Sequence, residues 1–196
     1  MGRYTTLSDG DLVARYLGGQ NGAFDELFGR YRSPIFTFLL RLVGNSTDAE
    51  DVFQDTFIKM IGALPRYTES DKFKSWLFGI ANNSALDHLR HRARKPTTLT
   101  PSSNAVKSDS DLIERLPSNE PGPDDLMAAD EDWCVLAEAV NLLPAEQRQV
   151  VALRQQEMTY QEIADVVGCS INTALGRMHY AVASLRKRLT QLEQIA

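Results

Sequence analysis

The sequence predicts an all-α protein with two small helical domains joined by a flexible acidic linker, the second domain containing a helix-turn-helix. Apolar residues recur at three- and four-residue intervals toward both ends of the chain, and no segment alternates as a strand would. Residues 96–132 contain five of the eight prolines and carry a net charge of −7. Such a segment cannot bury enough apolar surface to offset its ordering entropy. We therefore expect one domain over residues 1–95, a linker over 96–131 and a second domain over 132–196.

The first domain should begin with two helical segments. Ser8 and Asp11 form a capping pair in front of a short helix. The next apolar pattern runs from Phe24 to Leu42 and contains Pro34, a residue that the first turn of a helix tolerates. Gly44 should end this run.

Two longer helices should complete the first domain. The remaining elements are a helix over about residues 48–64, a polar loop over 66–71 and a helix over about 72–92. Thr47 and Glu50 form a T-x-x-E capping box that begins the first of these helices. Pro65 stops it, because proline interrupts helical hydrogen bonding.

The second domain should contain a helix over residues 132–141, another over about 144–155, and then a helix-turn-helix. Thr159 and Glu162 form a second capping box, Gly168 gives the freedom that a sharp turn needs, and Ser170 caps the last helix. An inward stripe is expected at Ile171, Ala174, Leu175, Met178, Ala181 or Val182, Leu185 and Leu189.

The opposite arc of the last helix carries Asn172, Thr173, Gly176, Arg177, Tyr180 and Ser184. These are polar side chains that hydrogen-bond to base edges and phosphates, and small ones that allow close approach. The pattern therefore predicts a helix that enters the DNA major groove. Taken alone, the same segment also fits a surface helical hairpin with no role in binding nucleic acid.

Charge is unevenly distributed along the chain. Residues 1–95 carry a net charge of +2 and residues 133–196 a net charge of 0, so the overall −5 belongs to the middle segment. A protein that binds DNA without a partner is usually basic overall. The acidic balance of this chain therefore suggests that a partner provides much of the affinity for DNA.

Other signals indicate what the chain lacks. Cys134 and Cys169 are far apart, with no C-x-x-C and no neighbouring His, so we expect reduced thiols and no metal site. No stretch approaches 18 apolar residues, and the N-terminus lacks the apolar core of a signal peptide. We expect a cytoplasmic protein with no cofactor and no membrane insertion of its own.

The helix over residues 48–61 has a distinctive outer face. Three carboxylates, an amide and an exposed isoleucine line it: Asp48, Asp51, Gln54, Asp55 and Ile58. One interpretation is a solvated face whose acids favour the positive end of the helix dipole. The other is a docking strip for a basic protein partner.

The helix that follows becomes basic toward its end. The run HLRHRARK over residues 88–95 concentrates positive charge and fits contacts to phosphates. Cations that simply offset the dipole at the C-terminus of a helix are the alternative.

Taken in order, the runs DAEDVFQDTFIKM, FKSWLFGIANNSALDHLRHRARK and LPAEQRQVVALRQQEMTYQEIADVVGCSINTALGRMHYAVASLRKRL resemble the extracytoplasmic-function sigma factors of bacteria. The resemblance covers about residues 8–190, with an acidic proline-rich linker between two motif blocks. It implies an initiation subunit of bacterial RNA polymerase, without catalysis of its own.

The resemblance implies a role for each surface. The acidic helix should bind core RNA polymerase through Asp48, Asp51, Gln54, Asp55 and Ile58. The promoter −10 element should meet Tyr67, Lys72, Trp76, Asn82, Asn83, His88, Arg90, Arg92 and Arg94. The −35 element should meet Ser170, Asn172, Thr173, Gly176, Arg177, His179 and Tyr180.

The chain departs from the family pattern at several positions. Leu77 stands where housekeeping relatives have a second melting aromatic, which suggests weaker unaided melting. Leu175, Gly176 and Tyr180 replace residues that would contact phosphates or bases in many members. Arg177 is left as the strongest donor in the first turns of the recognition helix.

The expected partners are core RNA polymerase, promoter DNA and an anti-sigma factor. The alternative function is a stand-alone helix-turn-helix regulator with an N-terminal sensor domain, which would leave the acidic helix unexplained. An enzyme with an appended DNA-binding domain is the weakest reading, because the chain has no phosphate-binding glycine loop, no H-E-x-x-H and no nucleophile elbow.

Overall fold

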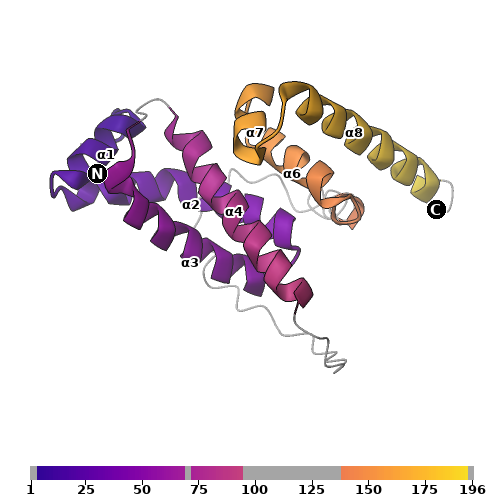
Figure 1. The fold of residues 1–196 in the computed structure, drawn as a ribbon, viewed down its shortest axis with the longest axis horizontal. Helices are drawn as coiled ribbons and strands as arrows, with labels where there is room; N and C mark the ends of the chain where they lie inside the picture. The colour runs from indigo at the N-terminus through magenta and orange to yellow at the C-terminus, as the bar shows by residue number, and fades with distance from the viewer. Residues whose placement is uncertain (1–3, 69–71, 95–137, 194–196) are drawn as a thin grey trace, which may run out of the picture.

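The computed structural model describes residues 4–68, 72–94 and 138–193, and within these ranges the regular structure is entirely helical. Figure 1 shows two groups of helices. The first group is α1 (Asp9–Leu17), α2 (Asn21–Val43), α3 (Ser46–Ala63), the 3-10 turn η1 (Leu64–Arg66) and α4 (Phe73–Arg94). The second is a helical turn over residues 138–141, α6 (Ala145–Arg154), α7 (Tyr160–Val167) and α8 (Ile171–Glu193). The expected linker, Cys134 and the expected helix start at residue 132 lie outside the described residues.

The cap at the start of α1 and the cap at the end of α2 follow the sequence closely. The Ser8 side chain accepts a hydrogen bond from the backbone N–H of Asp11, which confirms the predicted cap. Gly44 adopts the left-handed conformation with φ 85° and ends α2 as expected.

Pro34 lies inside α2 and not in a first turn, so that expectation was wrong. A proline within a helix removes one backbone hydrogen bond and costs about 3 kcal/mol. The surrounding apolar residues Ile35, Phe38 and Leu39 are completely buried, and this burial offsets the cost.

The start of α3 also differs from the prediction. The N-cap is Asn45, whose side chain accepts a hydrogen bond of 2.8 Å from the backbone N–H of Asp48. The helix therefore begins at Ser46, and Glu50 accepts a hydrogen bond from the Ser46 hydroxyl instead of closing a box with Thr47. Asn45 prevails because it follows the left-handed Gly44 directly and has the extended backbone that an N-cap needs.

Helix α4 packs across α2 and α3 and completes the N-terminal group (Figure 1). Aromatic rings fill the space between these helices. Phe38 and Phe78 join α2 to α4 with ring centroids 5.3 Å apart, and Phe28 and Phe57 join α2 to α3 at 5.0 Å. Edge-to-face contacts of this kind add specific geometry to the burial of apolar area.

The helix-turn-helix forms as predicted. Thr159 and Glu162 make a complete capping box, and Gly168 has φ 72° at the turn. The Ser170 hydroxyl accepts a hydrogen bond from the backbone N–H of Thr173, so Ser170 caps α8. Cys169 in this turn is half-buried and is a free thiol.

Several residues expected to point inward are exposed. Ala174 and Ala181 of α8 are fully buried, whereas Ile171, Leu175 and Val182 are each more than a third exposed. Ile61 on α3 is also 40% exposed. The buried stripe of α8 is narrower than its apolar pattern because α6 and α7 cover only part of that face.

The two groups of helices pack against each other. Helix α4 contacts α7, and α2 contacts α6, as Figure 1 shows. One continuous cluster of buried apolar residues includes Leu77 and Phe78 of the first group and Leu153 and Ile163 of the second. This packing determines which faces of α4 and α8 are open to a partner.

Candidate functional site

The acidic face of α3 is open to solvent over most of its length. Asp51 and Gln54 are exposed, and Ile58 is 70% exposed, which is high for an isoleucine. Asp55 is half-buried and forms an ion pair of 2.6 Å with Lys59 one turn away. These four side chains lie on the outer face of α3, where the sequence pattern placed them.

Asp48 differs from the rest of that strip because it joins α3 to α4. Its carboxylate accepts hydrogen bonds from the Asn45 amide at 2.7 Å and from Arg92 Nη1 at 2.6 Å. His88 Nε2 lies 3.2 Å away, as an ionic contact without good hydrogen-bond alignment. The Asn45 hydrogen bond and the positive charges of His88 and Arg92 hold the pKa of Asp48 below its ordinary value, against the opposing effect of burial.

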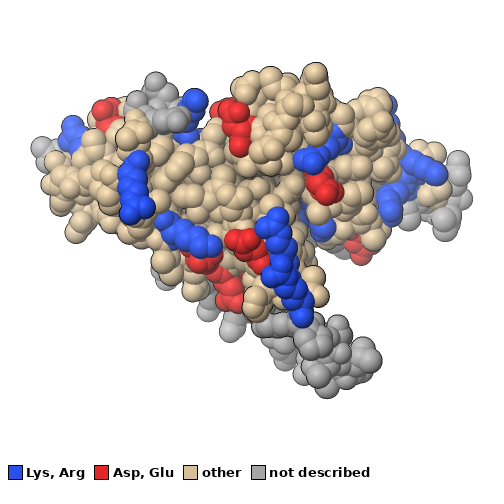
Figure 2. All heavy atoms as spheres, viewed as in Figure 1, with Lys and Arg blue, Asp and Glu red and all other residues tan. Residues whose placement is uncertain are grey.

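A groove of 610 Å³ runs between α3 and α4. It is lined by Asp48, Asp51, Val52, Asp55, Lys59, Ser84, Asp87, His88, His91 and Arg92. Figure 2 shows acidic and basic side chains side by side over this part of the molecule. The acidic strip and the basic end of α4 are therefore neighbouring parts of one charged surface.

The basic end of α4 is accessible. Arg90, Arg92 and Arg94 are exposed, and His88 is half-buried. Arg90 contacts Asp87 at 3.2 Å through side chains that are about two-thirds exposed, so solvent screens that pair strongly. The side chains of Arg90 and Arg94 therefore remain accessible, whereas Arg92 is also held by Asp48.

An aromatic cluster precedes the exposed part of α4. Tyr67 lies 4.7 Å from Trp76 and 5.6 Å from Phe73 between ring centroids. Tyr67 and Trp76 are half-buried and Lys72 is exposed. The cluster places aromatic edges next to the loop, of which residues 69–71 lie outside the described part of the chain.

The two neighbouring asparagines of α4 have opposite environments. Asn83 is exposed, whereas Asn82 is only 2% exposed. The Oδ1 atom of Asn82 accepts a hydrogen bond of 3.0 Å from Gln149 Nε2 of α6, inside the contact between the two groups of helices. Of the two, Asn83 is the one that a DNA strand could reach in this arrangement.

The predicted −35 residues lie along the first turns of α8. Asn172, Thr173, His179 and Tyr180 are exposed, the last of them by 65%. Gly176 and Arg177 are half-buried. Ser170 is exposed, and its hydroxyl is 2.8 Å from that of Thr173, so it acts mainly as the cap of the helix.

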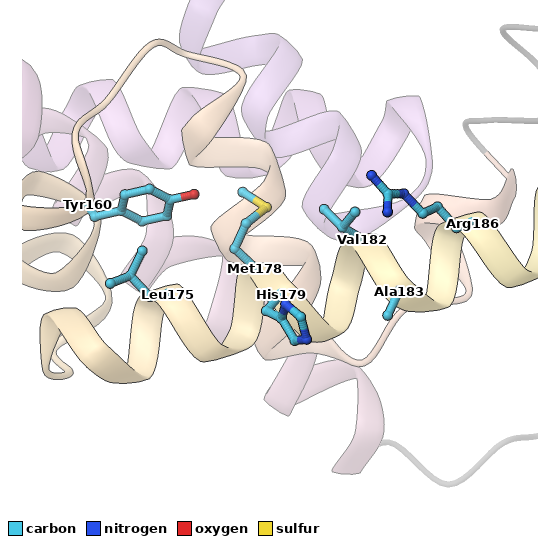
Figure 3. A pocket seen from close by; sticks show the side chains of 7 residues that line it. All are labelled: Tyr160, Leu175, Met178, His179, Val182, Ala183 and Arg186. Carbon is cyan, nitrogen blue, oxygen red and sulfur yellow. The ribbon is translucent and has the colours of Figure 1, made fainter.

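Leu175 and Val182, two of the apolar residues that α8 leaves exposed, line a groove of 400 Å³. Figure 3 shows Leu175, Met178, Val182 and Arg186 in a row along α8, with Tyr160 facing them from α7. The sequence pattern assigned Leu175 to the core and gave Val182 only as an alternative to the buried Ala181, and so it missed this groove.

Contacts between the two groups of helices were also missed. Lys74 Nζ donates a hydrogen bond of 2.6 Å to the backbone carbonyl of Gln156, and the Ser75 hydroxyl lies 3.4 Å from Glu162 Oε1. Burial raises the pKa of Glu162. Hydrogen bonds from Thr159 and the charge of the nearby Lys74 outweigh this effect and hold the pKa of Glu162 below its ordinary value. Helical periodicity gives no signal for partners more than 80 positions apart.

Two further findings concern metal ions and membranes. Over the described ranges, no three His, Cys, Asp or Glu residues are placed to hold a metal ion. The helices of the described part of the chain include none long and apolar enough to cross a membrane.

Comparison with known families gives two matches. Sigma-70 region 2 matches residues 27–95, which include α3 and α4. Sigma-70 region 4 matches residues 135–185, which include the helix-turn-helix.

The chain is similar along nearly its whole length to curated relatives. It is 31% identical to the RNA polymerase sigma-H factor of Pseudomonas aeruginosa, covering 96% of this chain and 97% of that protein. It is 33% identical to the RNA polymerase sigma factor CarQ of Myxococcus xanthus, covering 92% and 97%. It is 30% identical to the ECF RNA polymerase sigma-E factor of Escherichia coli K12, covering 95% and 96%.

Two solved structures share the fold. One is CnrH in complex with the cytosolic domain of CnrY, with a TM-score of 0.67 and 24% identity over 93% of this chain and 97% of that one. The other is the sigma factor RpoE in complex with the anti-sigma factor NepR from Bartonella quintana, with a TM-score of 0.67 and 23% identity over 85% and 96%.

The role of Asp48 predicts a specific pH dependence of stability. A carboxylate whose pKa is lowered in the folded state stabilises the fold above its unfolded value of 3.8, and this contribution is lost as the pH falls through the folded-state pKa. Asp48→Asn should therefore lower the melting temperature at about pH 5, and the difference from wild type should narrow toward about pH 2. Thermal melting across this range measures it.

Asp51→Asn on the exposed face of α3 is the matched control, and it should change the melting temperature little at any pH. A deficit for Asp48→Asn that stays constant from pH 5 to about pH 2 would contradict the ionic role of Asp48.

Proposed function

The chain belongs to the extracytoplasmic-function sigma factors, and on that premise we propose how its surfaces divide the work of promoter recognition. It is a transcription initiation factor that binds core RNA polymerase, recognises the −35 and −10 elements and initiates transcription of a signal-dependent regulon. Because it acts on RNA polymerase, the protein works in the cytoplasm. The observation that carries the division of work is that the acidic strip of α3 and the polar face of α8 are both solvent-exposed in one chain.

Core polymerase binds the exposed strip on α3. Asp51 and Gln54 supply polar contacts to a basic partner surface, and Ile58 supplies an apolar anchor at the same face. Asp55 lies one turn from Asp51 and forms an ion pair with Lys59 in the free chain. When the partner binds, Asp55 leaves Lys59 and pairs with a cation of the partner. Asp48 contributes mainly by holding α4 beside the strip.

The −10 element binds along α4. Arg90, Arg92 and Arg94 contact phosphates, because exposed cations at the end of a helix track a nucleic-acid backbone. Tyr67 and Trp76 form an aromatic platform for a base displaced from the stack, and such stacking contributes about 1–3 kcal/mol per base. This gain is comparable to the cost of unpairing one base, so the platform suits a strand that is already separating.

Three further side chains complete the −10 surface. Lys72 adds positive charge close to the platform, His88 lies farther along α4, and Asn83 is placed to hydrogen-bond to a base. Asn82 joins this set only after it leaves its contact with Gln149.

The −35 element binds the first turns of α8 in the major groove. Asn172, Thr173, His179 and Tyr180 present donors and acceptors, and Gly176 allows the helix to approach closely. Arg177 is the strongest reader among them, because an arginine that pairs with guanine contributes about 1–3 kcal/mol of discrimination. Ser170 orders the start of the helix so that these groups face the groove.

An anti-sigma factor restrains the protein. The support is the likeness to CnrH, whose structure holds the cytosolic domain of CnrY, and to RpoE, whose structure holds the anti-sigma factor NepR. Both structures contain a chain of this fold together with a bound partner. We therefore expect an inhibitor of this chain that contacts both helical groups.

Reconstituted transcription tests the docking assignment. The purified protein, bacterial core polymerase and a library of promoter fragments should give promoter-specific transcripts. Asp51→Lys should weaken association with core polymerase by roughly ten-fold or more, because it places a like charge against a basic partner. Fluorescence anisotropy of labelled protein against core polymerase measures the affinity.

Asp25→Lys is the matched control, since Asp25 is an exposed acid on α2 away from the strip. It should bind core polymerase as the wild type does. Equal affinities for the two variants would refute the assignment of the strip, provided that both melt like the wild type.

Promoter selection from a random duplex library tests the role of Arg177. Arg177→Ala should relax base preference at one or two −35 positions, since loss of one bidentate reader removes about 1–3 kcal/mol of discrimination. Lys187→Ala, which changes an exposed cation farther along α8, should weaken binding evenly across sequences. An unaltered −35 preference for Arg177→Ala would show that another residue reads this element.

A further inference from the structure

We propose that Leu175 of α8 is a specificity-determining residue that reads the 5-methyl group of a thymine in the −35 element. The inference rests on the proposed function of α8 and adds a base contact that the polar residues of this helix do not supply. The exposure of Leu175, its position on the helix and the chemistry of the DNA major groove support it.

Leu175 lies on an open part of α8. Its side chain is 43% exposed, whereas the residue before it, Ala174, is fully buried in the core cluster. A leucine that stays in water forgoes the free energy that burial of its side chain would contribute. A partner that covers Leu175 gains that free energy on binding.

The residues around Leu175 place it at the edge of the surface that faces DNA. Asn172 lies three residues before it and His179 four residues after it, and both are exposed. Positions three and four apart are neighbours on a helix surface, so Leu175 stands between these two polar side chains. A DNA groove that receives Asn172 and His179 therefore also covers Leu175.

Gly176 determines how closely α8 can approach the floor of the groove. A Cβ atom added at Gly176 would meet nothing within 4 Å, so the helix surface is open there. A helix with its side chains is about 10–12 Å across and the major groove is about 12 Å wide, so an inserted helix nearly fills the groove. Successive residues are about 100° apart around the helix axis, so Leu175 and Arg177 flank Gly176 on opposite sides. When Gly176 faces the floor, both flanking side chains meet base edges.

The thymine methyl is the apolar group that the major groove offers to such a side chain. The groups that distinguish the other bases there are hydrogen-bond donors and acceptors. Leucine cannot pair with them, and covering a polar group without giving it a partner is unfavourable. Leu175 therefore favours thymine through the methyl contact and disfavours bases whose polar groups it would cover.

The charge of α8 identifies a nucleic acid as the partner that covers this residue. Over residues 171–192 the chain has no Asp or Glu and carries four cations: Arg177, Arg186, Lys187 and Arg188. Arg186 lines the same groove as Leu175 (Figure 3). An apolar side chain beside a cation matches a base edge beside a phosphate.

Tyr160 of α7 limits the movement of Leu175. Both residues line the 400 Å³ groove, and Figure 3 shows the tyrosine ring next to Leu175. The guanidinium of Arg154 lies 5.4 Å from the centroid of the Tyr160 ring and stabilises its position. Leu175 therefore loses little conformational freedom when DNA binds, which preserves the gain from the methyl contact.

Replacement of thymine by deoxyuridine tests the methyl contact directly, because the two bases pair alike and differ only in the 5-methyl group. A promoter is first selected from a random duplex library by the wild-type holoenzyme, and each thymine of its −35 element, on either strand, is then replaced in turn. At one of these positions the wild-type holoenzyme should lose affinity by about four-fold, the factor expected when one methyl-sized group is not buried. Fluorescence anisotropy of the labelled promoter at a fixed salt concentration measures the affinity.

Leu175→Ala removes the apolar contact at an exposed position and introduces the strongest helix former, so the fold should be kept. Holoenzyme formed with this variant should bind the thymine and deoxyuridine promoters equally. Leu17→Ala is the matched control, because Leu17 is 48% exposed at the end of α1, in the other group of helices. Holoenzyme with Leu17→Ala should keep the preference for thymine.

A thymine preference that is present in wild type, lost in Leu175→Ala and kept in Leu17→Ala supports the proposal. A wild-type holoenzyme insensitive to every replacement overturns it, and this measurement needs no variant. A −35 element without thymine on either strand, or a preference that Leu175→Ala retains, also overturns it.

Two other results lead elsewhere. Weaker association of Leu175→Ala with core polymerase, with the thymine preference unchanged, would assign the groove to a protein partner and overturn the DNA contact. A holoenzyme that selects no promoter would refute the proposed function, and the contact of Leu175 with thymine would fall with it.

Discussion

The packing of α4 across α2 and α3 is the constraint on which every surface of this protein depends. Its buried face carries Phe73, Leu77 and Phe78, all at most 1% exposed, and its position is fixed further by the ion pair of Asp48 with Arg92. This one placement sets the basic end of α4 beside the acidic strip of α3, and it directs the Asn82 side toward α6. The proposed DNA-binding surface and the contact between the two groups thus share α4, and the proposed polymerase-binding strip on α3 lies directly beside it.

Sharing α4 in this way links the separate functions physically. The acid strip and the arginines of α4 line one groove, so a protein that binds the strip also changes the field that a DNA strand meets at the end of α4. The C-terminal group packs against another face of the same helix.

Much of the fold followed from local sequence, and the reasons are particular. Ser8, Gly44, Thr159 with Glu162, and Ser170 act within four residues of their partners, so their caps were predictable. Asn45 and Thr47 are both able to cap a helix and lie two residues apart. Asn45 is the N-cap because the backbone after Gly44 gives it the extended conformation that a cap needs. The expected position of Pro34 in a first helical turn was wrong because burial of the apolar residues around it stabilises α2 by more than the proline costs the helix. The Asp48 and Asn82 contacts span 44 and 67 positions, and no periodicity reports on such distances.

The central claim is that α3 faces the polymerase while α8 faces DNA in the same complex. The most direct measurement is photo-crosslinking of the promoter-bound holoenzyme with a photoreactive phenylalanine placed at Ile58 in one sample and at Tyr180 in another, both exposed by at least 65%. The account predicts that position 58 crosslinks to a core polymerase subunit and position 180 to the promoter DNA. Crosslinks from position 58 to DNA alone, or none from position 58 to the polymerase, would contradict it.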